Sequence, residues 1–155
     1  MSKQEDAARD LEAAAAELAN YIDECPDADW HAISASEGWT RAAVAYHCAA
    51  GNDVALGWIC QMLDRRRIYE TGETHNAANA ADAQRHELAT KSEAVETLRR
   101  TTQRTSEFLR SLTDEELARS AFHGVADRET TVGQFIANFS RHMRSHLAGL
   151  TEASA

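Results

Sequence analysis

Residues 131–150, TVGQFIANFSRHMRSHLAGL, decide the fold that we predict for this 155-residue chain. Apolar side chains recur in this stretch at three- and four-residue intervals, which predicts a helix with one face in a core. They are Val132, Phe135, Ile136, Phe139, Met143, Leu147 and Leu150. His146 lies near the centre of this face, and His142 lies one turn earlier at its edge. Histidines four residues apart point the same way and can share one metal ion, so the stretch also predicts part of a metal site.

The rest of the chain is also expected to be helical. It contains one proline, seven glycines and many alanines, and no alternating strand pattern is apparent, so we expect no sheet. Pro26 should end the first helix, and Thr40 should cap the second. A loop with Trp30 and Trp39 is expected to plug one end of the bundle. The expected helices cover residues 3–24, 40–69, 85–112 and 131–150, with connectors at 70–84 and 121–130 and a short helical turn from Thr113.

A third histidine lies on the predicted inner face of the second helix. His47 falls among Val44, Gly51, Val54, Ala55, Trp58, Ile59 and Met62, which share that face. Gly51, one turn after His47, is unfavourable inside a helix by about 1 kcal/mol relative to alanine. Its bare backbone is expected to leave room for a neighbouring helix or a ligand.

The positions of the three histidines predict the topology. His47 is near the start of its helix, whereas His142 and His146 are near the end of theirs, so the two helices must be antiparallel for the histidines to meet. With the third helix antiparallel to the last, the bundle runs up, down, down, up. The connector at 70–84 must then climb the bundle; extended, it spans up to about 50 Å against roughly 40 Å for such a helix. The predicted fold class is therefore an all-α four-helix bundle with a long crossover between helices 2 and 3.

Composition limits the classes of partner. With 25 acidic and 16 basic residues the formal charge is −9, which disfavours nucleic acid. No apolar run approaches the ~20 residues that cross a bilayer, and the first residues do not resemble a signal peptide, so we expect no membrane contact. Three cysteines without a CxxC pair are typical of a reducing compartment. We expect one domain over residues 1–155, located in the cytoplasm.

Two motifs resemble a known family. GWTRAAVAYH, residues 38–47, resembles the opening of helix 2 in the DinB-like superfamily of metal-binding bundles, and residues 131–150 resemble its last helix. NAANA, residues 76–80, is similar to the connector of the mycothiol-dependent maleylpyruvate isomerase branch. The resemblance implies the crossover bundle, a divalent metal on His47, His142 and His146, and frequently a homodimer. It does not imply a substrate, because the superfamily includes isomerases and transferases that use mycothiol or bacillithiol beside many proteins without an established activity.

Three imidazoles leave at least one position on the metal for water or substrate, which is typical of catalytic sites. Zinc and nickel are the expected ions. No carboxylate shares the inner face with the histidines, since Asp53 lies about 120° away around its helix, and a carboxylate ligand from a connector is left open. We expect the ion to activate a low-molecular-weight thiol, such as mycothiol or bacillithiol, for transfer to, or isomerisation of, a small electrophile. The alternatives are a hydrolase that uses metal-activated water, a bundle that binds a metal or small molecule without turnover, and an interaction module whose histidines are core residues without metal.

Several other residues are candidates for supporting roles. Arg141 and Arg144 flank the histidine pair and either meet a carboxylate of the thiol or substrate or face solvent. Gly51 and Thr102 are expected to line a cavity beside the metal. We expect Cys48, Cys60 and Trp58 to be core residues. Four further histidines in or near connectors are expected at the surface, with His123 nearest to the mouth of the cavity: His31, His75, His86 and His123.

Overall fold

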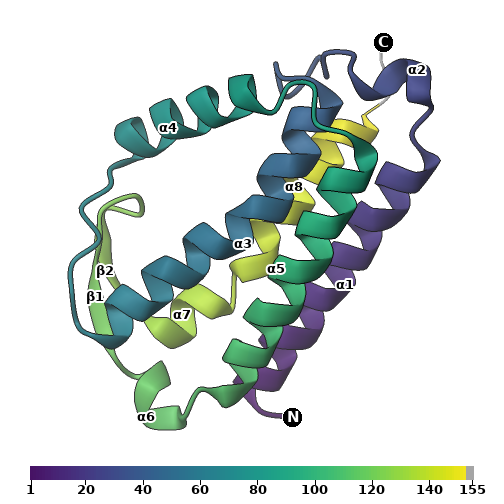
Figure 1. The fold of residues 1–155 in the computed structure, drawn as a ribbon. Helices are drawn as coiled ribbons and strands as arrows, with labels where there is room; N and C mark the ends of the chain where they lie inside the picture. Colours follow the sequence, from purple (N-terminus) through teal and green to yellow (C-terminus); the bar gives the residue numbers. More distant parts are fainter. Residues whose placement is uncertain (153–155) are drawn as a thin grey trace.

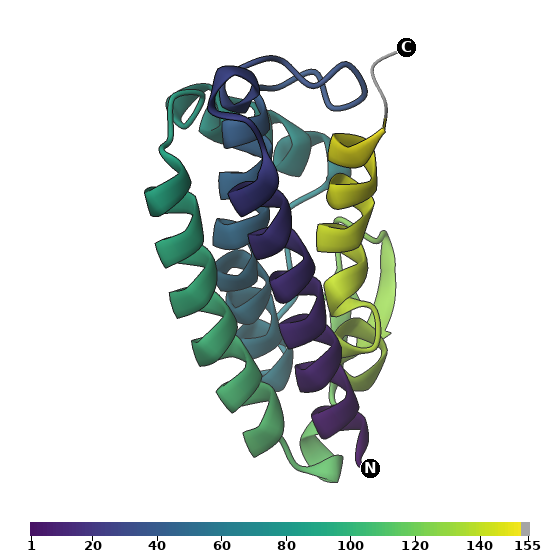
Figure 2. The same ribbon diagram turned by 90° about the vertical axis from the view of Figure 1, so that its right-hand side faces the viewer.

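The bundle consists of four helical segments that run alongside one another in the computed structural model, which describes residues 1–152 (Figure 1). α1 packs against α5 and α8, and α3 packs against the same two helices. The chain runs up, down, down and up through the four segments, as Figures 1 and 2 show. The predicted four-helix bundle with its crossover is therefore confirmed. The segments are α1 (Lys3–Glu24), α3 (Arg41–Leu63), α5 (Lys91–Ser111) and the pair α7 (Val132–Ile136) and α8 (Phe139–Thr151).

The long helices begin at hydroxyl residues that cap their first turn. The Thr40 side chain accepts a hydrogen bond from the Ala43 N–H at 3.1 Å, which confirms the predicted start of α3. At α5, Thr90 accepts from the Glu93 N–H, and the Glu93 carboxylate accepts from the Thr90 N–H at 2.7 Å. Each such cap typically contributes about 1 kcal/mol to helix stability.

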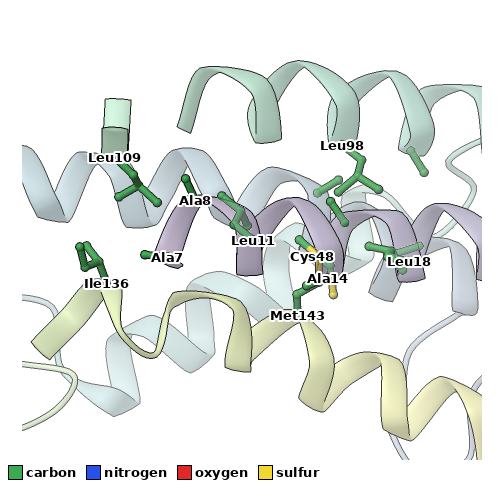
Figure 3. Packing of buried hydrophobic residues seen from close by; sticks show 14 of the residues in the cluster. Ala7, Ala8, Leu11, Ala14, Leu18, Cys48, Leu98, Leu109, Ile136 and Met143 are labelled. Carbon is green, nitrogen blue, oxygen red and sulfur yellow. The ribbon is translucent and has the colours of Figure 1, made fainter. Parts of the chain in front are cut away.

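The core lies between the four segments and is built around the apolar face of α1. Leu11, Ala14 and Leu18 on this face are fully buried. Figure 3 shows them among Cys48 of α3, Leu98 and Leu109 of α5, and Ile136 and Met143 of α7 and α8. Small alanine side chains at several of these contacts let the helix backbones approach closely.

The predicted connector at 70–84 is largely a helix, so its description as a plain linker was wrong. α4 (Gly72–Arg85) begins at a capping box formed by Thr71 and Thr74 and spans most of the crossover. Its alanines are strong helix formers, which outweigh the asparagines that favour a loop. Among the bundle helices, α4 makes substantial contact with α3 only. Figure 1 shows α4 standing away from the other three segments.

The boundaries predicted beside the crossover were too wide. α3 ends at Leu63 rather than near residue 69, because Arg65 adopts a left-handed conformation with φ 55° that a helix cannot continue through. α5 begins at Lys91 rather than near residue 85, because its cap is Thr90. Leu88, which falls within the predicted helix 85–112, lies before α5 and is 71% exposed.

The last predicted helix is interrupted. α7 ends at Ile136 and α8 begins at Phe139, with Asn138 between them at φ −115° and ψ 11°. The Asn138 side chain donates to the Gln134 carbonyl at 3.3 Å. Asparagine favours such local bonds over helix continuation, which explains the break.

A short hairpin contradicts the expectation of no strands. β1 (Ser120–His123) pairs antiparallel with β2 (Arg128–Thr131), and His123 lies directly opposite Arg128. Strands of four residues are too short for a period-two pattern to stand out in the sequence. The two remaining short helices are α2 (Asp27–Trp30) and α6 (Asp114–Leu117).

One end of the bundle is closed by the loop after α1. Trp30 is buried there, and its indole N–H donates to the Ala89 carbonyl at 2.8 Å. Trp39 is partly buried, with its ring edge-on to His47 at a centroid distance of 5.4 Å. Within residues 1–152, no helix combines the length and the apolar character needed to span a lipid bilayer.

Candidate metal centre

Three histidines from two antiparallel helices meet at one level of the bundle. His47 comes from α3, and His142 and His146 come from α8. The Nε2 atoms of His47 and His146 each lie 3.2 Å from Nε2 of His142, and one ring nitrogen of each residue lies within 4.8 Å of the others. Nitrogen ligands at the usual zinc distance are about 3.3 Å apart in a tetrahedral site. The spacing of the donor atoms therefore fits a shared metal ion, whose presence stays a prediction.

The surroundings keep two of these imidazoles neutral, which is the form that binds a metal. His47 is 7% exposed, and its pKa is lowered to about 4, first by burial and then by the charges of His146 and His75. The pKa of His142 is also lowered, first by desolvation and then by its histidine neighbours. His142 nevertheless remains accessible from the solvent side, because it lies on the wall of a cavity.

A carboxylate orients the third imidazole. Oε2 of Glu37 lies 2.5 Å from Nδ1 of His146, and the Glu37 side chain is only 13% exposed. With Nδ1 donating to this carboxylate, Nε2 of His146 has its lone pair free to face the other two rings. The sequence analysis left open a carboxylate metal ligand from a connector. In the structure, the loop carboxylate of Glu37 contacts the His146 ring instead.

The last turn of α8 has room for Glu37 only because residue 149 is glycine. A Cβ atom on Gly149 would lie 2.9 Å from Cδ of Glu37, closer than such atoms approach one another. The Gly149 carbonyl also accepts a hydrogen bond from the Ser36 hydroxyl at 2.6 Å. Sequence reasoning missed Glu37, and the only available signal was a glycine one turn beyond the HxxxH pair.

A cavity of about 880 Å³ opens beside the histidines and includes His47, Gly51 and His142 in its wall. The other walls are α4, the β1–β2 hairpin and the residues around the break between α7 and α8. This volume is typical of sites for small molecules. α4, which contributes residues to the cavity wall, stands away from the other bundle helices in Figure 1.

The expectation for Gly51 is confirmed, and that for Thr102 was wrong. A Cβ atom on Gly51 would lie 3.7 Å from Cε1 of His142, so the bare backbone gives room to this ring. Thr102 instead lies between α3 and α5, where Asn52 donates to its hydroxyl at 3.4 Å. It therefore belongs to a buried polar contact outside the metal cavity.

The two arginines beside the histidine pair have different surroundings. Arg141 lines the cavity. Arg144 is paired with Asp10 at 2.6 Å and with Glu17 at 3.3 Å, so it ties α8 to α1. Only Arg141 is placed to meet a ligand.

Several side chains expected at the surface or in the core line the cavity instead. His123 is 3% exposed, and the His75 ring is half-buried. The Trp58 ring lies against both, with centroid distances of 5.1 Å to His75 and 4.9 Å to His123. Two other expectations are confirmed: Cys48 is buried and His31 is exposed. Cys60, expected in the core, is exposed, and Val54, expected on the inner face, is 49% exposed. His86, expected at the surface, is half-buried against Tyr46.

Known proteins share this architecture. YfiT from Bacillus subtilis, described as a probable metal-dependent hydrolase with an unusual four-helix bundle topology, superposes with a TM-score of 0.79 at 21% identity, over 98% of this chain and 87% of that one. The mycothiol-dependent maleylpyruvate isomerase gives a TM-score of 0.74 at 15% identity, and a mutant of it gives 0.76 at 12%. This chain, covered to 98%, spans 62% of the isomerase. No curated protein matches the sequence.

The sequence itself also matches a family model. The model describes the DinB superfamily, and the match runs over residues 10–150, which include all three histidines and the crossover. The predicted resemblance is thereby confirmed, and the chain belongs to the DinB superfamily.

Proposed function

We propose that His47, His142 and His146 bind one divalent metal ion, zinc or nickel, and that the chain is an enzyme that uses it to activate a low-molecular-weight thiol. The thiol would be transferred to a small electrophile or would isomerise it. The observation that carries the proposal is the convergence of three imidazole nitrogens beside an 880 Å³ cavity, whose wall includes His47 and His142. Three protein ligands leave at least one metal position for an exchangeable group.

The chain's own residues prepare the site for this chemistry. Burial keeps His47 unprotonated at neutral pH, and Glu37 holds the tautomer of His146 that leaves Nε2 free. Apolar side chains on the cavity wall, such as Val54 and Phe135, exclude water from the bound electrophile. When bound, the divalent ion supplies a positive charge that lowers the pKa of a thiol or water at its open position.

A thiol such as mycothiol or bacillithiol is favoured as the nucleophile. The fold similarity to a mycothiol-dependent isomerase supports this choice, although the chain spans only 62% of that protein. The three cysteines of the chain offer no substitute: Cys25 and Cys48 are buried, burial raises the pKa of the Cys48 thiol, and Cys60 does not line the cavity. The nucleophilic sulfur must therefore come from a second small molecule.

The alternative is hydrolysis by metal-activated water. It is favoured by the similarity to YfiT, which is described as a probable metal-dependent hydrolase. Both activities need the same metal ligands and differ in whether a thiol is consumed.

The first test measures metal. Untagged protein is purified, and its metal content is determined by elemental mass spectrometry for the wild type, for His47→Ala and for the matched control His31→Ala, which alters an exposed histidine. We expect about one equivalent in the wild type and the control and a loss in His47→Ala. A wild-type protein that neither contains metal nor binds added zinc or nickel would end the proposal.

The second test separates the two activities. The metal-loaded protein is incubated with a chlorodinitrobenzene and either mycothiol or bacillithiol, and thioether formation and chloride release are followed. In parallel, ester and amide substrates are offered without thiol. Thiol-dependent turnover that His47→Ala abolishes supports the transferase, whereas turnover only without thiol replaces it by the hydrolase.

We further propose that residues 1–155 act as a single domain and that two copies form a homodimer, as the resemblance to the superfamily implies. Light scattering coupled to size-exclusion chromatography gives the mass directly. A mass near twice 17.1 kDa supports the dimer, and a mass near 17.1 kDa contradicts it.

A further inference from the structure

The end of the cavity formed by the hairpin combines two side chains that can bind an anion. His123 and Arg128 are directly opposite partners in the antiparallel β1–β2 ladder. Directly paired residues project from the same face of a sheet, with Cβ atoms about 5 Å apart. Both residues, and Thr130 on the same face, line the cavity.

His123 has a buried hydrogen-bond donor without a partner among the described residues. Its Nδ1 atom accepts a bond from the Ala126 N–H at 3.4 Å, so the ring proton is on Nε2. Nε2 is buried and has no hydrogen-bond partner among the described residues. Leaving a buried donor unsatisfied costs about 1–3 kcal/mol, so an acceptor atom of a bound molecule would stabilise this arrangement.

Arg128 adds a positive charge that forms no salt bridge with a carboxylate in the described part of the chain. Within residues 1–152, no salt bridge involves Arg128 or Arg141. The cavity wall carries three arginines and two carboxylates, and one of each, Arg85 and Asp82, pair at 3.1 Å. The arginines and carboxylates left on the wall are Arg128, Arg141 and Glu70, so their net charge is positive although the formal charge of the whole chain is −9.

Aromatic rings flank the donor. The Trp58 ring meets the His123 ring edge-on at a centroid distance of 4.9 Å, and the Phe135 ring stacks on it at 5.4 Å. Trp58 and Phe135 both line the cavity. A ligand held at His123 therefore has flat apolar surfaces beside it.

The hairpin is held firmly in place. The Ile68 N–H donates to the Phe122 carbonyl at 2.9 Å, and the Gly124 N–H donates to the Ile68 carbonyl at 3.0 Å, so the segment after α3 continues the hairpin on one side. Donors that are already in position lose little entropy when a ligand binds.

We propose that the hairpin end of the cavity is a carboxylate-binding subsite, in which His123 Nε2–H and the Arg128 guanidinium hold the carboxylate of a small molecule whose planar apolar body rests on Trp58 and Phe135. The substrate class of the proposed enzyme is then an electrophilic planar carboxylate that extends from the hairpin toward the three histidines. As a substrate assignment it rests on the proposed function. As a binding site it needs no metal.

The test uses benzoate and its neutral isostere benzamide on the full-length, metal-free protein, which removes binding of the carboxylate to metal. An NMR titration gives the dissociation constants and the chemical-shift changes of the Trp58 indole N–H and the Ala126 amide. We expect benzoate to bind about tenfold more tightly than benzamide and to shift both signals. Arg128→Gln should weaken benzoate binding about tenfold and leave benzamide unchanged, because a charged hydrogen bond is lost.

Three further variants sharpen the result. His123→Phe keeps the aromatic contacts and should weaken benzoate binding about fivefold. Glu70→Gln removes the nearby negative charge and should not weaken it. Arg9→Gln, which removes an equal charge on α1 outside the cavity, should have no effect.

Equal binding of benzoate and benzamide, or unchanged affinity in Arg128→Gln, overturns the subsite. So does benzoate binding that shifts neither signal. Because the protein is metal-free, these outcomes are independent of whether the histidines bind metal. A chain that takes up no metal but binds benzoate through Arg128 would refute the proposed enzyme and retain the subsite.

Discussion

Glu37 is the residue outside the three histidines on which their geometry depends most directly. Its carboxylate contacts Nδ1 of His146 at 2.5 Å, and the space it occupies exists because Gly149 has no side chain. Carboxylates behind metal-binding histidines typically change metal affinity by about 10- to 100-fold. Gly149 should therefore influence the site without touching a histidine.

We expect Gly149→Ala to keep the fold and weaken metal binding. Alanine favours a helix over glycine by up to about 1 kcal/mol, and the atoms it displaces are the end of the flexible Glu37 side chain. The loss in affinity for zinc should approach the roughly 10- to 100-fold loss of Glu37→Gln. Competition with a chromophoric chelator measures both, and Glu24→Gln, an exposed carboxylate on α1, is the control. Unchanged zinc affinity in both Gly149→Ala and Glu37→Gln would show that Glu37 does not orient His146.

The positions of the three histidines could be predicted from the sequence, but the roles of the neighbouring residues Glu37 and His123 could not. His47, His142 and His146 stand on apolar helical faces, where period alone makes them conspicuous. Glu37 and His123 lie in a loop and a four-residue strand, and they reach the cavity through contacts with distant parts of the chain. No local pattern encodes such contacts.

Among the elements, the β1–β2 hairpin depends on Gly124, whose backbone lies against that of the segment after α3. A Cβ atom on Gly124 would lie 2.7 Å from the Ile68 carbonyl oxygen, and this backbone cannot move aside as a side chain can. We expect Gly124→Ala to lower the free energy of unfolding by about 2–3 kcal/mol, because the contact with Ile68 is overpacked and its hydrogen bond is lost. Gly57→Ala in α3, where a Cβ meets nothing within 4 Å, should raise that free energy by about 0.5–1 kcal/mol. Urea titrations compare the two variants, and a Gly124→Ala protein as stable as the wild type would contradict the close contact.

The elements show which kinds of sequence signal are reliable. The start of α3 was predicted closely from the cap at Thr40, and the start of α1 was predicted closely without a cap. α4 was taken for a loop because its sequence has little apolar periodicity; it stands out from the bundle with a single buried residue, Ala83. The break at Asn138 interrupts a stretch whose apolar period is otherwise continuous, so the period alone predicts one helix.

For the whole molecule, the demand that three histidines meet was a stronger guide than any single helix boundary. It required antiparallel α3 and α8 and a long crossover, and this topology holds although the boundaries of α3 and α5 were several residues off. Topology tolerates such errors because it depends on the order and direction of long elements, whereas the cavity depends on the crossover helix and the hairpin. The bundle was thus predictable and the shape of its cavity was not.

Burial of His47 and His142 makes the stability of the metal-free molecule depend on pH. Folding lowers the pKa of His47 from 6.5 to about 4, so between these values the unfolded chain binds a proton that the folded chain does not. Stability should then rise with pH from about 4 to about 6.5 and level off above, since the slope follows the protons bound by the unfolded state in excess of the folded state. The lowered pKa of His142 acts in the same direction.

Thermal unfolding of chelator-treated protein across this range measures the effect, with His47→Gln as the comparison. We expect a lower unfolding temperature toward pH 4 in the wild type and a shallower dependence in the variant, which lacks one buried imidazole. The paired carboxylate of Asp10 does not mimic this window: its pKa is lowered by its bonds to Ser140 and Arg144 from an ordinary 3.8, so its contribution is lost only at lower pH. A wild-type unfolding temperature that stays constant between about pH 4 and 6.5 would mean that His47 is not held neutral by burial, and the donor set would then not be ready for a metal at neutral pH.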